Sequence, residues 1–370
     1  MTERNIVDAA ARLRREHEPH LVATVACVRG SAYRRPGARM LITRFRWVAG
    51  SVSGGCLEGD IASKGWWRTK DGDPVVVTYD SRVIDAADDE DIRAAFGLGC
   101  DGVVEVLLER SGVPGRIDAL EVAQRCLAKQ QRGAVATVFR GPARIGTRAA
   151  MIGDAIEAED MPDELKAWLV ADMQAAIAEG KSRNTEHGGI EILVEAILPP
   201  PRLFVIGTGH DAVPVAALAK QLGWDVVVCA RQQKFSDRDR FATDIFVGSD
   251  AEICARIDAS DRALAIVMSH NYERDRDMLG ALMDSQAHYI GMLGPKARTT
   301  RMFAELGRAP DERVHAPVGL ELGAETPTEI ALAIVAEAQA VLTSTPATSL
   351  RERRVPIHTE VRAEPVLVAV

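Results

Sequence analysis

The 370-residue sequence has little of several features that mark particular classes of protein. It lacks the roughly 18 consecutive apolar residues that a membrane-spanning helix needs. Its polar start, Met1–Asn5, lacks the apolar stretch of a signal peptide. The formal net charge of −8 argues against non-specific binding of nucleic acid. We therefore expect a cytoplasmic protein that binds neither membrane nor nucleic acid.

Cysteine is also sparse, with six residues and no CxxC pair. This pattern disfavours zinc-ribbon and thioredoxin-type sites. In a reducing compartment the six side chains are expected to be free thiols. Because most free cysteines are simply buried small hydrophobes, a functional role for any one of them must be argued from its position.

The chain is long enough for two domains, and three successive prolines, Pro199–Pro201, form a stiff break between two differently patterned regions. We predict an α/β protein, in which an N-terminal α+β domain (1–198) is followed by a Rossmann-like, doubly wound domain (199–345) and a tail (346–370). The tail ends in an apolar run, Val366–Val370, which is able to add to the sheet of a second copy in a homodimer.

The first region combines helical and strand patterns. The expected helices cover 6–17, a segment ending near 66, and 162–180, and the expected strands cover 21–28, 40–42, 74–79, 103–109 and 190–197. Residues 23–39 resemble residues 136–148, with a strand, a glycine turn and a returning strand in each. This similarity indicates either a duplication or two hairpins that are similar by chance. Only the first stretch is followed by a Gly-Gly-Cys sequence.

That sequence, Gly54-Gly55-Cys56-Leu57-Glu58, lies in a loop that leads into a predicted helix. A helix N-terminus favours the thiolate form of a cysteine, and glycines leave the backbone open to a bulky ligand. Cys56 and Glu58 are therefore the candidate catalytic residues. Glu58 is either an acid–base group or a cap of the first helical turn.

A second cysteine, Cys100, also lies in a glycine-rich loop. Thiolates suit soft metal centres and sulfur transfer, which makes Cys56 a candidate metal ligand and Cys100 a candidate cofactor-binding residue. Arg34 and Arg39, close to the first loop in sequence, are candidate donors to a phosphate. The alternative is that both cysteines are simply packed in turns.

The second region predicts alternating strands and helices. Expected strands are 203–206, 224–229, 244–247, 263–268 and 289–293, with helices at 213–222, 274–286 and 327–342. Gly207-Thr208-Gly209-His210-Asp211-Ala212 joins the first strand to the first helix and matches G-x-G-x-x-A. In this context Gly207, Gly209 and His210 indicate a phosphate-binding turn, or else a tight turn that binds nothing.

The second strand ends in Val228-Cys229-Ala230-Arg231, without the carboxylate that normally binds the ribose of NAD. Arg231 is either a partner for an anion such as a 2′-phosphate or a solvated charge. If a nucleotide binds, we expect NADP or another phosphorylated ligand in preference to NAD. His270, at the end of the fourth strand, is a further candidate beside His210.

Taken together, the motifs resemble the XdhC/CoxI family of xanthine dehydrogenase accessory factors over residues 20–342. The stretches that carry the resemblance are Gly30-Ser31-Ala32, Pro36-Gly37, Gly54–Glu58, Gly99-Cys100-Asp101-Gly102, Gly207–His210, Tyr289–Gly294 and Ala316–Ile330. Three residues depart from the family pattern: Cys229 replaces an acid, Asp101 a glycine and Pro295 a serine.

The resemblance implies a protein that binds the molybdenum cofactor (molybdopterin), assists its sulfuration and delivers it to a molybdenum hydroxylase. The partners it implies are a cysteine desulfurase and the large subunit of the hydroxylase, and the functional thiol it implies is Cys56. Two rival hypotheses are an NAD(P)-dependent oxidoreductase that uses His210 or His270, and a nucleotide-sensing Rossmann protein. The accessory-factor hypothesis requires Cys56, whereas the oxidoreductase hypothesis requires bound nicotinamide and tolerates Cys56→Ala.

Overall fold

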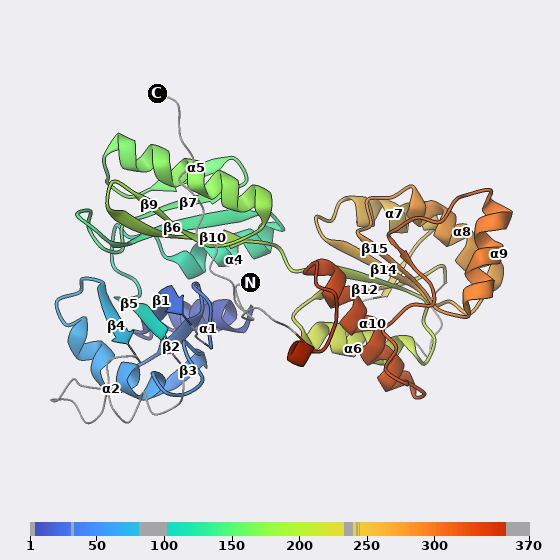
Figure 1. The fold of residues 1–370 in the computed structure, drawn as a ribbon, viewed down its shortest axis with the longest axis horizontal. Coiled ribbons are helices and arrows are strands. Elements are labelled where there is room, and N and C mark those ends of the chain that lie inside the picture. Colours follow the sequence, from blue (N-terminus) through green and yellow to red (C-terminus); the bar gives the residue numbers. More distant parts are fainter. Residues whose placement is uncertain are drawn as a thin grey trace. The chain divides into compact units, whose positions relative to one another are not determined.

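A computed structural model describes residues 4–30, 33–80, 102–232, 240–241, 243 and 245–352. The chain forms two compact units that meet in sequence at Leu198 and Pro199 (Figure 1). Within the described residues, none of the helices has the length and apolar character to cross a membrane. The predictions that concern Cys100, Asp101 and the C-terminal run 366–370 fall outside the described residues.

The first unit contains two five-stranded antiparallel sheets with the same strand order, β3-β2-β1-β5-β4 and β8-β7-β6-β10-β9. The first copy consists of α1 (Arg4–Arg15), β1 (Leu21–Gly30), β2 (Arg39–Ile42), β3 (Trp47–Gly50), α2 (Glu58–Arg68), β4 (Val75–Asp80) and β5 (Gly102–Arg110). The second copy consists of α4 (Ala119–Lys129), β6 (Gly133–Arg140), β7 (Arg148–Ile152), β8 (Ala155–Ala158), α5 (Asp163–Glu179), β9 (Arg183–His187) and β10 (Ile190–Ile197). The element order is the same in both, so the similarity in sequence reflects a repeated fold.

The turns between the first two strands of each copy show how far the repetition extends. In the first copy the Gly37 N–H donates to the Val25 carbonyl at 2.8 Å. In the second copy the Gly146 N–H donates to the Val138 carbonyl at the same distance. Both glycines have positive φ, +89° and +80°, which side chains disfavour, so the same turn requires glycine twice.

The two sheets have their outer faces covered by helices, α2 on the first and α5 on the second (Figure 1). Their inner faces share a core with α1 and α4. Because successive residues of a strand point to opposite faces, Met40 packs in the outer core with α2 and Leu41 packs in the shared inner core. Hydrophobic burial between the copies therefore makes them one unit.

Two buried ion pairs cross the inner layer in a reciprocal pattern. Arg39 of the first copy bonds Glu195 of the second at 2.6 Å, and Arg148 of the second copy bonds Glu109 of the first at 2.6 Å. Each arginine opens the second strand of its copy, and each glutamate lies on the last. A buried charge is costly without a partner, so these pairs fix how the two copies face each other.

The second unit is a six-stranded parallel sheet with the order β13-β12-β11-β14-β15-β16. Its elements are β11 (Arg202–Ile206), α6 (Ala212–Gln221), β12 (Asp225–Ala230), β13 (Ile245–Val247), α7 (Asp250–Asp258), β14 (Ala263–Val267), α8 (Tyr272–Met283), β15 (Tyr289–Met292), α9 (Lys296–Leu306), β16 (Val314–His315), α10 (Pro327–Leu342) and the 3-10 turn η2 (Leu350–Glu352). Strand order reverses between β11 and β14. The predicted α+β domain followed by a doubly wound Rossmann-like domain is confirmed.

Candidate functional site

The cysteine loop consists of the seven residues 51–57 that connect β3 to α2. Its two apolar residues, Val52 and Leu57, are buried in the outer core of the first copy. Glu58, the first residue of α2, accepts hydrogen bonds from the N–H groups of Val52 (3.1 Å) and Ser53 (2.8 Å). The two buried side chains and the Glu58 carboxylate anchor the loop to the rest of the first copy.

Ser53 extends this network toward the cysteine. Its hydroxyl donates to the second oxygen of Glu58 and accepts from the N–H groups of Gly55 and Leu57, both at 3.1 Å. The backbone on both sides of Cys56 is thus fastened to one buried carboxylate. Sequence reasoning missed Ser53, because a serine directly before a glycine pair carries no distinctive pattern.

Glu58 is only 4% exposed. Burial alone would raise its pKa, but the hydrogen bonds from the Ser53 hydroxyl and from backbone N–H groups outweigh burial and lower the pKa below 4.5. The group is therefore ionised at neutral pH and its oxygens are engaged. Of the two roles considered from sequence, this geometry favours holding the first turn over exchanging protons.

Cys56 is half-buried at the edge of the outer core, just before α2 begins. Among the other described cysteines, Cys27, Cys126 and Cys229 are buried. Burial raises the pKa of Cys126 to about 11 and that of Cys254 to about 11. Cys56 is therefore the described thiol best placed to meet a ligand.

The two glycines before Cys56 have different surroundings. Gly55 has a φ of +120°, and an added Cβ would meet nothing within 4 Å, so the space beside it is open. A Cβ on Gly54 would lie 3.6 Å from the ring of Tyr33, which is 67% exposed. One side of the loop is therefore open, and an aromatic ring borders the other.

Arg34 reaches the same loop, as its place in the sequence predicted. Its Nε donates to the Ser51 hydroxyl at 3.2 Å, and that hydroxyl donates to the Ser53 carbonyl at 2.8 Å. The guanidinium also lies 5.8 Å from the centre of the Tyr33 ring. A positive charge is thus present beside the thiol loop.

The structure does not bring Arg39 to the cysteine loop. Arg39 lies on the inner face of the first sheet with Leu41, whereas the loop packs on the outer face with Met40. The Arg39 guanidinium is buried and bonds Glu195 and the Gly37 carbonyl. Its observed contacts join the two copies, because the alternation of side chains along β2 turns it away from Cys56.

The second copy contains no counterpart of this site. Its connector between β8 and α5 has four residues, 159–162, against seven in the first copy. Its turn is also shorter, because four residues separate Gly141 from Gly146 and six separate Gly30 from Gly37. In the first copy this connector and this turn contact each other. Tyr33 of the turn lies against Gly54 of the connector, and Arg34 of the turn donates to Ser51 of the connector.

In the second unit, the glycine loop lies where strand order reverses. Gly207 has a φ of +141°, and a Cβ there would lie 2.4 Å from the Met268 carbonyl, so only glycine fits. His270 bonds the carboxylate of Asp211 at 2.9 Å, which joins the loops after β14 and β11. His210 contacts Arg240 at 3.4 Å. The predicted Gly207, Gly209, His210 and His270 therefore meet at the carboxyl edge of the sheet, where ligands bind in such folds.

At the end of β12, Arg231 forms two hydrogen bonds with Asp250, the first residue of α7, one of them at 3.1 Å. Cys229 is buried, and burial raises its pKa to about 12. A ligand phosphate at Arg231 would have to compete with this ion pair. The prediction that Arg231 meets an anion stays a prediction.

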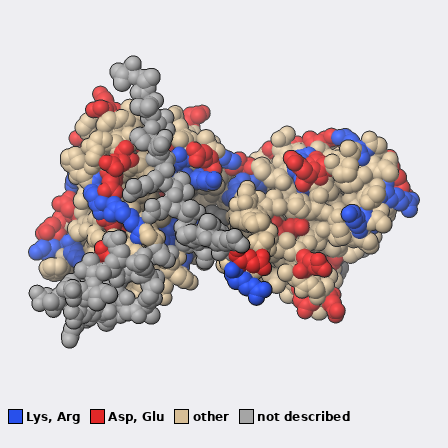
Figure 2. Space-filling model, viewed as in Figure 1, with Lys and Arg blue, Asp and Glu red and all other residues tan. Residues whose placement is uncertain are grey.

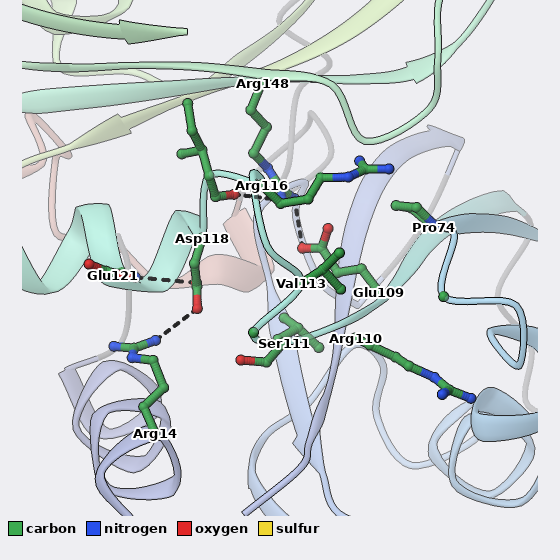
Figure 3. A pocket seen from close by; sticks show the side chains of 14 residues that line it. Arg14, Pro74, Glu109, Arg110, Ser111, Val113, Arg116, Asp118, Glu121 and Arg148 are labelled. Atoms are coloured by element: carbon green, nitrogen blue, oxygen red, sulfur yellow. Dashed lines mark hydrogen bonds and ion pairs between the residues drawn. The ribbon is translucent and has the colours of Figure 1, made fainter. Parts of the chain in front are cut away.

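A separate cavity of about 240 Å³ lies between the two copies of the first unit (Figure 3). Two of its arginines are engaged by carboxylates, Arg14 by Asp118 at 2.9 Å and Arg148 by Glu109 at 2.6 Å. Val22 places this cavity on the inner face of the first sheet, away from the cysteine loop. On the face shown in Figure 2, basic and acidic side chains are interspersed on each unit.

The fold and the thiol loop define a two-unit protein in which a repeated α+β unit, with the partly exposed Cys56 loop among its described residues, precedes a Rossmann domain. Residues 13–80 match the model of the XdhC and CoxI family, and residues 203–338 match that of the XdhC Rossmann domain. The chain belongs to the XdhC and CoxI family.

Individual relatives span most of the chain. A probable xanthine dehydrogenase subunit from Bacillus subtilis (strain 168) is 28% identical over 87% of this chain and 93% of its own length. The molybdenum cofactor insertion chaperone PaoD of Escherichia coli (strain K12) is 25% identical over 87% of this chain and 83% of its own. A crystal structure described as a xanthine dehydrogenase from Bacillus halodurans superposes with a TM-score of 0.74 at 25% identity, covering 93% of this chain and 98% of its own.

Proposed function

We propose that this protein is an accessory factor in molybdenum cofactor maturation for a xanthine dehydrogenase-type hydroxylase. In this role it binds the cofactor, assists its sulfuration and delivers it to the large subunit of the hydroxylase. The observation that carries the proposal is the half-buried Cys56 in a hydrogen-bonded loop with open space beside Gly55. The E. coli relative is named a molybdenum cofactor insertion chaperone, which supports this role, and the name of the B. subtilis relative supports a link to xanthine dehydrogenase.

Each residue of the loop has a defined task in this proposal. The Cys56 thiolate binds the soft molybdenum–sulfur centre of the cargo. Gly55 leaves room for a bulky ligand, and Arg34 offers a charge to its phosphate. Glu58 keeps the loop in place through Ser53. A cysteine desulfurase is the partner that supplies sulfur, and Cys100 is a second cofactor-binding thiol.

We also propose that the glycine loop of the second unit binds a phosphorylated ligand. Gly207 and Gly209 form the turn that leads into the N-terminus of α6, and His210 and His270 lie beside them. Since β12 ends without a carboxylate, we expect NADP to bind more tightly than NAD. A titration with both nucleotides tests this preference, and tighter binding of NAD contradicts it.

The main test is the molybdenum and pterin content of protein purified without oxygen from a host that makes the cofactor. The wild-type protein is expected to retain the cofactor at near-stoichiometric level, and Cys56→Ser is expected to lose most of it. Cys254→Ser is the matched control, because Cys254 is also partly exposed but lies in the second unit. Absence of cofactor from all three proteins would overturn the carrier function.

A further inference from the structure

The two copies of the repeat provide an internal control for what the cysteine site needs. Arg35 and Arg144 each stand two residues before the turn glycine of their copy. The Arg35 carbonyl accepts from the Ala38 N–H, and the Arg144 carbonyl accepts from the Thr147 N–H in the same way. Arg35 therefore corresponds to Arg144. Pairing Ser31-Ala32 with Pro142-Ala143 leaves Tyr33 and Arg34 as the two extra residues of the first copy. The copy with the cysteine loop thus has an added aromatic ring and an added positive charge.

Both added residues are directed at the loop. The Tyr33 ring lies against Gly54, where three of its atoms would be 3.6, 3.7 and 3.8 Å from an added Cβ. Its 67% exposure is high for an aromatic side chain, since burying the ring would gain free energy. The shorter turn of the second copy has no residue that corresponds to Tyr33.

The geometry suits a flat ligand. An exposed aromatic ring against Gly54, two residues before the cysteine in the same loop, offers a face for stacking of a heteroaromatic ring. Arg34, whose guanidinium is 5.8 Å from the ring centre, offers a charge to an anionic substituent of the same molecule. The ring and the charge thus contact Gly54 and Ser51 of the loop that carries the thiol.

We infer that Tyr33 is the stacking residue of the cysteine site and that, with Arg34, it selects ligands with a planar fused heterocycle and an anionic group. The inference rests on the proposed function, in which the ligand of Cys56 is a pterin with a phosphate. It adds a residue that determines ligand specificity by contacting the heterocycle and not the metal. A ligand that lacks molybdenum is therefore still expected to bind.

The probe is pterin-6-carboxylate, a fluorescent pterin with an anionic group and neither molybdenum nor dithiolene sulfur. Its binding to the full-length protein is followed by fluorescence anisotropy. Tyr33→Leu is expected to raise the Kd about tenfold, which is typical of a lost stacking partner. Tyr33→Phe keeps the ring and is expected to stay within about twofold of wild type.

The matched control is Trp67→Leu, because Trp67 is also 67% exposed but lies at the far end of α2. That end is about 13 Å along the helix from the cysteine loop, at the usual rise per residue. The Kd of this variant is expected to equal that of wild type. Equal loss in Trp67→Leu and Tyr33→Leu would show non-specific adsorption and overturn the inference.

Cofactor content separates this inference from the proposed function. If Tyr33→Leu binds the probe and retains the molybdenum cofactor like wild type, while Cys56→Ser loses the cofactor, the carrier function stands and the stacking role is wrong. If wild type fails to bind the probe, the stacking role is also overturned. If Tyr33→Leu weakens probe binding and leaves the alkylation rate of Cys56 unchanged, the ring acts on the ligand and not on the thiol.

Discussion

The two copies of the first unit share the order of their elements but differ in the lengths of several connections. They share strand order, turn glycines and reciprocal ion pairs. They differ in the connector before α2 or α5 and in the turn that contacts it in the first copy. They also differ in the connection between the last two strands, which has 21 residues (81–101) in the first copy and two (188 and 189) in the second. The shared features stabilise the fold, so the features that only the first copy has are the ones to examine for function.

The largest expected difference between the copies is in thiol reactivity. At pH 8 the half-buried Cys56 is expected to react with iodoacetamide long before the buried Cys126. Burial raises the pKa of Cys126 to about 11, so that only about one thiol in a thousand is ionised at this pH. Peptide mass spectrometry over time measures both rates. Equal rates in the folded protein would contradict the difference in burial. As a control, the two thiols are expected to react at equal rates in guanidinium, which unfolds the protein and exposes both.

Breaking an ion pair between the copies is expected to lower the free energy of unfolding strongly. Glu195→Ala leaves the Arg39 guanidinium buried without its partner and should cost about 3–5 kcal/mol. Glu109→Ala should cost less, because Arg148 keeps its bonds to the Thr137 hydroxyl and the Ile117 carbonyl.

Urea unfolding measures both costs. Asp73→Ala is the control, since the Arg144–Asp73 pair is exposed and such pairs contribute about 1 kcal/mol or less. If Glu195→Ala were no more costly than Asp73→Ala, the ion pairs would have no part in holding the copies together.

Glu58 should stabilise the cysteine loop only while it is ionised. Glu58→Gln is expected to cost about 1.5–3 kcal/mol at pH 7, the usual range for hydrogen bonds to a charged group. Because the folded pKa lies below the ordinary 4.5, this stability is fully present above pH 4.5 and is lost as the pH falls through the folded pKa. The difference between variant and wild type should therefore shrink in acid.

The control for this prediction is Glu164→Gln, in the first turn of α5 of the second copy. Glu164 is exposed, and its loss should change stability by about 0.5 kcal/mol or less at either pH. Unfolding curves at pH 7 and pH 4 measure both variants. A constant cost for Glu58→Gln across this range would show that its charge is not what holds the loop.

The smallest expected difference concerns two corresponding threonines. Thr137→Val removes the acceptor for the Arg148 Nε at 3.0 Å and should cost about 1 kcal/mol. Thr24→Val should be neutral or slightly stabilising, since the described residues give the buried Thr24 hydroxyl no hydrogen-bond partner. Thermal unfolding of both variants measures the two changes in stability. Equal losses would contradict the prediction, because they would mean that the two hydroxyls make similar hydrogen bonds in solution.

The elements that sequence patterns located best are those with local signals. The predicted helix 327–342 agrees with α10 because Thr326 and Glu329 form a capping box and Pro327 opens the first turn. The predicted strand 190–197 agrees with β10. Helices α4, α7 and α9 were not predicted, although Ser249 and Glu252 form a capping box at α7.

The site was predictable only in part, because several of its contacts join distant residues. Gly54, Gly55, Cys56 and Glu58 were identified from their spacing, and Arg34 lies beside them. The partner of Arg39 is 156 residues away, and no local pattern indicates it. The alternation along β2 does place Arg39 opposite to Met40, so its inward direction could have been expected.

The reciprocal ion pairs have a consequence for how this unit is related to simpler proteins. When one residue contacts a second and their counterparts make the same contact in reverse, the pattern is that of an isologous interface in a twofold-symmetric dimer. Here both halves belong to one chain. Covalent linkage frees each half to change separately, so one half can lose a loop that both protomers of a true homodimer must keep.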